Sequence, residues 1–449
     1  MTMVPKSERN FYADHLVEIN KTNPVITTQD ICNSLGATVI PKGTNITEDV
    51  ANKISKFKLD LPIELQVNLA VRISPNELFN DINEIQTKIF GSSNTLSATK
   101  ELIRQCGLLN AFPLVSQKLT VFEERMPLKY SDTQGVAGFA VLIALKLGLS
   151  AASVEIIFAA AQMHDAGFLN INPQTALNLE SFSEDERRTL YKEQLSLGKN
   201  FLDQVPHLPK AVGISVLAHQ ERKDGSGWPE GIIGDHNTFE SQVVGLAVLL
   251  HEAYSRNLKP RGFDRSHLIP VIEVQSESFN IDVYHAAVEM LRQGAHKTSQ
   301  VIPYEFMPSL ANYLVVLQRT LIHWFDLAKS CSKEMNEAQS TDGEDRSFLL
   351  ISSLEQLYRN SGVWEDGIRT WLSEIADCMK PEECTEVELV ALMLESVLQK
   401  LKCLQWSLRE KAKSLGDEWV ERCDELAVIL YSLPSDHFEA FEKFDCFEG

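Results

Sequence analysis

Residues 159–167 read AAAQMHDAG, and residues 219–231 read HQERKDGSGWPEG. The first stretch places His164 and Asp165 at the end of an apolar helical pattern. An imidazole and a carboxylate are costly to bury there unless they pair with each other or bind a metal ion. In the second stretch, Asp224, Pro229 and three glycines fall within eight residues, which predicts a loop with unusual backbone angles. Found together in one chain, the two stretches are more specific than either is alone.

The sequence around these motifs predicts a block of buried helices. Apolar residues dominate 136–147, 154–163 and 242–254, and an apolar segment at 212–218 leads into the glycine-rich loop. Ser183-Glu184-Asp185-Glu186 has the pattern of a capping box, so a helix is expected from there toward Leu202. These helices would hold the His-Asp pair in an apolar surrounding.

The N-terminal part predicts a different structure, a small β-rich element over residues 24–72. Leu65, Val67, Leu69 and Val71 alternate with more polar neighbours, which is typical of a half-buried strand, and one short helix is expected over 50–57. From the capping box Ser74-Pro75-Asn76-Glu77 onward the pattern becomes helical, with further helices expected at 98–106 and 114–124. These helices would connect the β-rich element to the central block.

The C-terminal part predicts a helical bundle. Residues 331–347 contain almost no large apolar side chain and are expected to form a loop or linker. A capping box is expected at Thr385-Glu386-Val387-Glu388. After it, apolar residues alternate spacings of four and three, at Val390, Leu394, Val397, Leu401, Leu404 and Leu408. We favour a helix packed inside a bundle over a dimerising seam, because the repeat is shorter than a coiled coil needs.

Length and charge restrict the function. The chain has 449 residues, which suggests about two or three domains, and a formal net charge of −20, which disfavours nucleic-acid polymers and anionic membranes as partners. Residues 301–449 hold 28 acidic and 14 basic residues, so any charged partner of that block should be basic. No apolar run is long enough to span a membrane, and the N-terminus lacks an apolar signal core, so a cytoplasmic protein is expected.

The central block resembles the HD-GYP family, the HD-superfamily subgroup associated with hydrolysis of bacterial cyclic di-GMP. The resemblance covers roughly residues 126–300 and rests on the His-Asp pair, His219, and a loop in which Asp224, Gly225, Gly227, Trp228 and Pro229 match the family's Asp-Gly-Ser-Gly-Tyr-Pro, with Trp228 in place of Tyr. It implies a helical bundle around a two- or three-metal site. We therefore expect a mainly α protein divided into a β-rich element (1–73), connecting helices (74–125), an HD-GYP-like domain (126–330) and a C-terminal bundle (348–449).

The resemblance also implies that this site is degenerate. His164, Asp165 and His219 keep the family's residues, whereas five positions differ: Asp132, Phe168, Gln194, Gln220 and, in a less secure register, Leu249. One family metal site would retain Asp132, His164 and Asp165, but the other would retain only Asp165 and His219. Amides are poor ligands for transition metals, so no binuclear centre and no family-level phosphodiesterase activity is expected.

Two interpretations of the remaining polar residues stay open. They form either a structural hydrogen-bonded network or a mononuclear site in which Asp132, His164, Asp165 and His219 bind one divalent metal. The first makes the chain a catalytically degenerate HD-GYP-like signalling protein that binds a protein partner or a cyclic dinucleotide, with Trp228 as a candidate contact. The second makes it a mononuclear metal-dependent phosphohydrolase. A homodimer through the 390–408 seam is the less favoured assembly.

Overall fold

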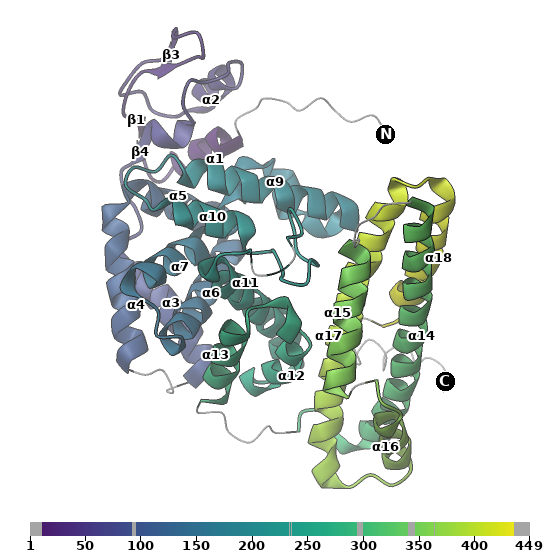
Figure 1. Cartoon of the computed structure of the whole chain (residues 1–449). Coiled ribbons are helices and arrows are strands. Elements are labelled where there is room, and N and C mark those ends of the chain that lie inside the picture. The colour runs from purple at the N-terminus through teal and green to yellow at the C-terminus, as the bar shows by residue number, and fades with distance from the viewer. Residues whose placement is uncertain are drawn as a thin grey trace. The chain divides into compact units, whose positions relative to one another are not determined.

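The computed structural model describes residues 11–91, 96–232, 234, 236–293, 300–339, 346–362 and 364–434, and it is mainly α-helical, as the sequence predicts (Figure 1). The chain divides into two compact units. The first contains residues 1–220 and 238–251, and the second contains residues 221–237 and 252–449. None of the described helices is long and apolar enough to cross a membrane.

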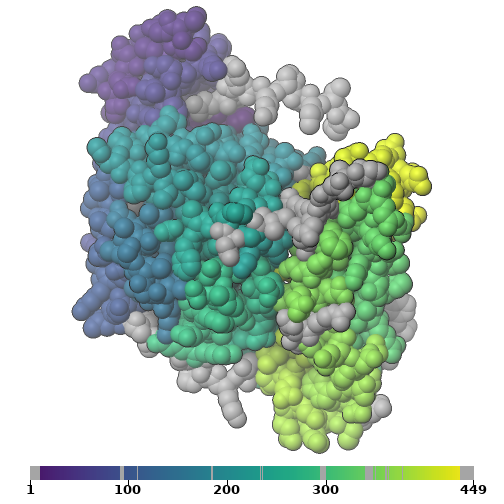
Figure 2. All heavy atoms as spheres, in the orientation of Figure 1, coloured from purple at the N-terminus to yellow at the C-terminus, as the bar shows by residue number. Residues whose placement is uncertain are grey.

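The first unit begins with a small mixed element, whose atoms are coloured purple to blue in Figure 2. Its helices are α1 (Phe11–Ile19) and α2 (Glu48–Ile54), and its strands are β1 (Val25–Thr27), β2 (Ile31–Cys32), β3 (Thr38–Ile40) and β4 (Val67–Leu69). Two antiparallel pairs form, β1 with β4 and β2 with β3. The expected strands are thus present, but helices hold more of the element's residues than strands do. Its last strand is shorter than the alternation over 65–71 suggests, because Ile63–Leu65 forms a 3-10 turn.

A buried ion pair connects this element to the helices behind it. The Lys118 ammonium lies 3.2 Å from a carboxylate oxygen of Glu64 and 2.7 Å from the side-chain oxygen of Asn170. It also lies 4.2 Å from the centre of the Tyr12 ring. Both charged side chains are almost completely buried. Because an unpaired charge would be very unfavourable at this depth, the pair fixes the element against α5.

The rest of the first unit is a helical bundle in which the predicted helices are present. Their bounds are α3 (Pro75–Phe90), α4 (Leu96–Leu108), α5 (Pro113–Arg125), α6 (Pro127–Lys146), α7 (Ala151–Met163), α8 (Pro173–Leu177), α9 (Glu184–Leu202), α10 (Lys210–Ala218) and α11 (Phe239–Glu252). Ser74 and Ser183 form the predicted capping boxes with Glu77 and Glu186. Helices α6 and α7 are buried over most of their length, so the polar residues that they carry lie in the core of this unit.

The second unit is built mainly from long helices. It contains α12 (Leu268–Glu273), α13 (Ile281–Arg292), α14 (Met307–Gln339), α15 (Arg346–Ser361), α16 (Asp366–Asp377), α17 (Cys384–Lys413) and α18 (Asp417–Tyr431). Helix α17 packs against α12, α14, α15 and α18. Five of the six predicted seam residues, all except Val390, are fully buried within the chain, as expected for a helix inside a bundle.

Two predictions for this region are wrong. Residues 331–339 are not a loop but the last turns of α14, since Cys331 and Met335, four residues apart, supply enough apolar surface to bury one face. The prediction for 340–345 lies outside the described residues, and α15 begins at Arg346. Helix α17 does not begin with a capping box at Thr385. It begins at Cys384 after a 3-10 turn over Pro381–Glu383, which the Glu383 carboxylate caps by accepting a hydrogen bond from the backbone N–H of Lys380.

Candidate functional site

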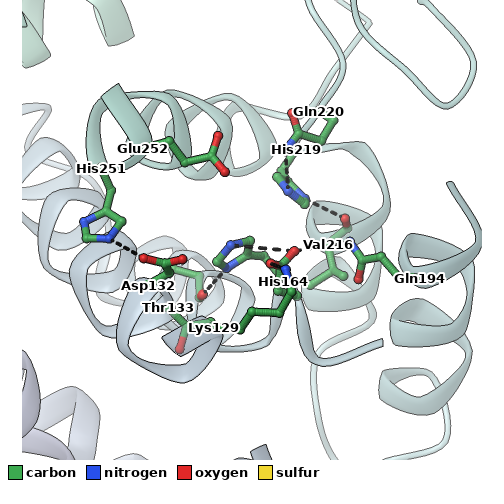
Figure 3. A network of polar contacts seen from close by, with 12 residues as sticks. Lys129, Asp132, Thr133, His164, Gln194, Val216, His219, Gln220, His251 and Glu252 are labelled. Carbon is green, nitrogen blue, oxygen red and sulfur yellow. Dashed lines mark hydrogen bonds and ion pairs between the residues drawn. The ribbon is translucent and has the colours of Figure 1, made fainter. Parts of the chain in front are cut away.

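Two histidines lie at equivalent places in the core of the first unit. His164 directly follows α7 and His219 directly follows α10, and their rings are 5.3 Å apart and almost perpendicular (Figure 3). The Nδ1 atom of each ring lies 2.8 Å from the backbone oxygen three residues earlier, that of Ala161 or Val216. When Nδ1 donates to that oxygen, Nε2 carries the lone pair, which is how proteins orient imidazoles that bind metals.

The lone pair of His219 already has a partner. The side-chain nitrogen of Gln220 lies 3.2 Å from Nε2 of His219, so the amide can donate to the atom that a metal would need. Gln220 stands where the family has the second histidine of its pair. At this position the chain therefore has an amide that can donate to His219.

The Asp165 carboxylate accepts hydrogen bonds from two side chains. The Lys129 ammonium lies 3.1 Å from Oδ2 of Asp165, and the amide nitrogen of Gln194 lies 3.4 Å from Oδ1. Burial by itself would raise the pKa of Asp165, but the nearby positive charge of Lys129 outweighs it and lowers the pKa to about 2. Asp165 is therefore an ionised carboxylate whose charge is neutralised by Lys129.

Lys129 also lies beside Phe168. Its ammonium is 3.9 Å from the centre of the Phe168 ring, which is fully buried and meets Tyr191 edge to face. The phenyl ring stands where the resemblance places the family's lysine. A positive charge is thus still present here, but it comes from α6 and is directed at Asp165.

The Asp132 carboxylate forms another pair, with His251. Its Oδ1 atom lies 3.1 Å from Nε2 of His251 in the last turn of α11, two residues after the half-buried Leu249 (Figure 3). The His251 ring fits directly against Gly135, where even a methyl group would overlap it. Asp132 and His251 therefore form a specific contact between α6 and α11.

These contacts disfavour a metal centre of the family's type. Across the residues that the structure describes, no three His, Cys, Asp or Glu side chains gather closely enough to hold a metal ion. A divalent ion on Asp165 would have to displace the Lys129 ammonium, and one on His219 would have to displace the Gln220 amide. The donor set of this chain does not fit the family's two-metal centre.

The glycine-rich loop belongs to the second unit and has its own buried charges. Asp224 accepts hydrogen bonds from the backbone and hydroxyl of Ser226 and from the hydroxyl of Ser278, and it lies 2.9 Å from the ammonium of Lys400 on α17. The Glu221 carboxylate accepts hydrogen bonds from the backbone N–H groups of residues 230, 231 and 232. Gly225 has a φ of 78°, which a glycine adopts without strain. The loop is thus fixed from within its own unit.

Sequence reasoning identified His164, Asp165, His219 and the replaced positions, but it missed Lys129 and Lys400 and gave His251 no role. Lys129 lies three residues before Asp132 on the same helix, and this spacing is the one signal that could have associated it with the site. Lys400 is separated from Asp224 by most of the second unit, so nothing local in the sequence connects them.

Comparison with known proteins identifies a domain in the region that contains these residues. Residues 117–277 match the family model of the HD domain, so the fold and the motif place an HD domain in the middle of the chain. The match covers the His-Asp pair, His219 and the glycine-rich loop.

Curated relatives define the subgroup more closely. The chain is 36% identical over 107 residues to the cyclic di-GMP phosphodiesterase response regulator RpfG of Xanthomonas campestris pv. campestris, covering 24% of this chain and 28% of that protein. It is 25% identical over 122 residues to the cyclic di-GMP phosphodiesterase PdeB of Borreliella burgdorferi, covering 26% and 32%. It is 30% identical over 106 residues to a probable cyclic di-GMP phosphodiesterase of Vibrio cholerae, covering 22% and 24%. The predicted resemblance to the HD-GYP family is confirmed, and the matches span less than a third of each relative.

Proposed function

We propose that this chain is a catalytically inactive relative of the cyclic di-GMP phosphodiesterases and that it signals by binding, without turnover. The observation that carries the proposal is the ion pair between Lys129 and Asp165. In a two-metal hydrolase of this kind the motif aspartate bridges the ions, as the resemblance implies. Here a lysine neutralises that carboxylate.

Electrostatics supports an inactive site. A divalent ion bound to Asp165 would stand close to the Lys129 ammonium, and two like charges in a buried setting repel strongly. The neighbouring positions cannot compensate, because Gln194 and Gln220 offer neutral amides, which are weak ligands for transition metals. The polar residues satisfy one another instead, as buried polar groups in a structural network do.

The binding role follows from what is retained. The HD-type fold and the glycine-rich loop are kept, and named relatives act on cyclic di-GMP, so a cyclic dinucleotide is the first ligand to test. A protein is the second candidate partner, with Trp228 in the loop as its candidate contact. Isothermal titration of the whole chain with cyclic di-GMP distinguishes the two candidates, because heat of binding is expected only if the cyclic dinucleotide is the ligand.

Metal content and turnover test the inactive state. Protein purified without chelator should contain no stoichiometric Fe, Mn, Zn or Ni, and it should not hydrolyse cyclic di-GMP when these ions are added. The His164→Ala, Asp165→Ala double variant is the matched control. Hydrolysis by the wild type that disappears in the double variant would refute the proposal and favour the alternative, a mononuclear phosphohydrolase using Asp132, His164, Asp165 and His219.

A further inference from the structure

The C-terminal bundle of the second unit contains a pocket that is built from aromatic and acidic side chains. Three rings meet there: Phe325 on α14, Tyr358 on α15, and Trp364 just before α16. Tyr358 stacks on the indole of Trp364 with ring centres 4.5 Å apart and planes 20° apart. Phe325 stands nearly perpendicular to the same indole at 4.8 Å. The orientation of the indole is therefore fixed by two neighbours.

Burial shows which ring can meet a ligand. Phe325 and Tyr358 are only 2% and 1% exposed, whereas Trp364 is half-buried. The pocket has a volume of about 460 Å³, enough for a side chain or a small molecule, and all three rings contribute to its wall. The indole nitrogen of Trp364 is itself buried and donates no hydrogen bond to any residue that the structure describes. A rigid aromatic surface is thus presented to an open space.

The remaining wall of the pocket is acidic. Asp326, Glu355 and Glu365 complete its lining. Glu355 is paired with Lys329 at 2.6 Å, but Asp326 and Glu365 are exposed and form no ion pair with any described residue. The surrounding block is acidic as well, with 28 acidic against 14 basic residues over 301–449. Phosphates and carboxylates would be repelled here, and cations attracted.

We propose that this pocket binds a guanidinium group. A flat, delocalised cation can lie against the face of an indole while its N–H groups donate to carboxylates, and arginine side chains combine both contacts more readily than the compact ammonium of lysine does. The site lies in α14, α15 and the turn before α16, and it shares no residue with the HD motif. It is therefore independent of the proposed function of that motif.

The guanidinium could come from a free metabolite or from an arginine in a partner protein, and the chemistry of recognition is the same. Calorimetric titration of the whole chain with N-acetyl-L-arginine amide tests the shared chemistry, and N-acetyl-L-citrulline amide is the neutral isosteric control. A peptide with one arginine flanked by neutral residues separates the sources. If it binds more than tenfold tighter than the amide, the pocket recognises a protein segment; otherwise it recognises the free cation.

Variants that change surface charges test the guanidinium site without removing buried side chains. We expect the amide to bind and the citrulline analogue not to bind. Asp326→Asn with Glu365→Gln should weaken binding at least tenfold. Lys329→Gln should strengthen it severalfold, because it removes a positive charge that lies 2.6 Å from the Glu355 carboxylate in the wall of the pocket. Trp364→Leu should abolish binding. Glu334→Gln removes an exposed charge from the same helix outside the pocket, where Glu334 pairs with Arg422, and should change nothing. Equal binding of citrulline, or unchanged affinity in the Asp326→Asn, Glu365→Gln variant, would overturn the proposal.

Discussion

Replacing Lys400 by methionine should strongly destabilise the second unit. The Lys400 ammonium lies 2.9 Å from Oδ2 of Asp224, and the two side chains are 3% and 0% exposed. Methionine keeps much of the length of the side chain but removes its charge. The variant therefore leaves the Asp224 carboxylate buried without its cation, the situation in which a broken pair is most costly.

The magnitude follows from two independent arguments. Removing one partner of a buried ion pair costs about 3–5 kcal/mol in other proteins. Burial by itself would raise the pKa of Asp224, but Lys400 and then Ser226 lower it to about 2 from the ordinary 3.8. That shift corresponds to roughly 2–3 kcal/mol of stabilisation at neutral pH. Because Ser226 and Ser278 still donate to the carboxylate, we expect a loss of about 3 kcal/mol, near the lower end of the first range.

Urea denaturation at pH 7, followed by circular dichroism, measures this loss. Lys413→Met on the same helix is the matched control, because Lys413 is exposed and should contribute less than about 0.5 kcal/mol. Adding Asp224→Asn to Lys400→Met should recover part of the loss, since the carboxylate that lost its cation is then replaced by a neutral amide. The reasoning is refuted if Lys400→Met costs less than about 1 kcal/mol or if Asp224→Asn gives no recovery.

The pH dependence has a defined sign. Because the pKa of Asp224 is lower in the folded chain, the stabilisation from the pair is present above about pH 3.8 and is lost as the pH falls toward 2. The difference in stability between wild type and Lys400→Met should therefore shrink as the pH is lowered through this window. A difference that stays constant from pH 4 to pH 2 would show that lost packing, not lost charge, causes the effect.

Three further predictions concern the first unit. Lys118→Met should lower the free energy of unfolding, measured by urea denaturation, by about 3–5 kcal/mol. Adding Glu64→Gln should recover part of this loss. Unchanged stability of the single variant would show that the pair is not buried in solution. Gly135→Ala should force the His251 ring out of its place and cost about 1–3 kcal/mol, with shifted His251 resonances in NMR spectra; an unshifted ring would contradict the tight fit. Burial, reinforced by nearby positive charges, lowers the pKa of His15 to about 4 from 6.5. The free energy of unfolding should therefore fall by roughly 1.4 kcal/mol for each unit by which the pH is lowered from 6.5 to 4. His15→Leu should flatten this slope.

The sequence predicted features that depend on neighbours along the chain. The capping boxes at Ser74 and Ser183 formed because each needs only residues three positions apart. The 331–339 segment was mistaken for a loop, because two small or flexible buried residues, Cys331 and Met335, are a weak pattern in a polar surrounding.

The candidate site shows the same limit. The family's motifs located His164, Asp165 and His219, since a resemblance assigns positions one by one. It could not show that Lys129 would neutralise Asp165, because the direction of a side chain depends on how α6 packs against its neighbours. The pairing of Asp224 with Lys400 depends in the same way on the arrangement of the second unit.

The division of the chain has a practical consequence for work on fragments. The polypeptide passes from one unit to the other after residues 220, 237 and 251, so no single cut releases either unit whole. A fragment ending at residue 277, where the HD domain match ends, would contain every recognisable motif. It would lack Ser278 and Lys400, two of the side chains that hold Asp224. Binding measured on such a fragment would report on a loop without its anchor, and a negative result there would say nothing about the intact chain.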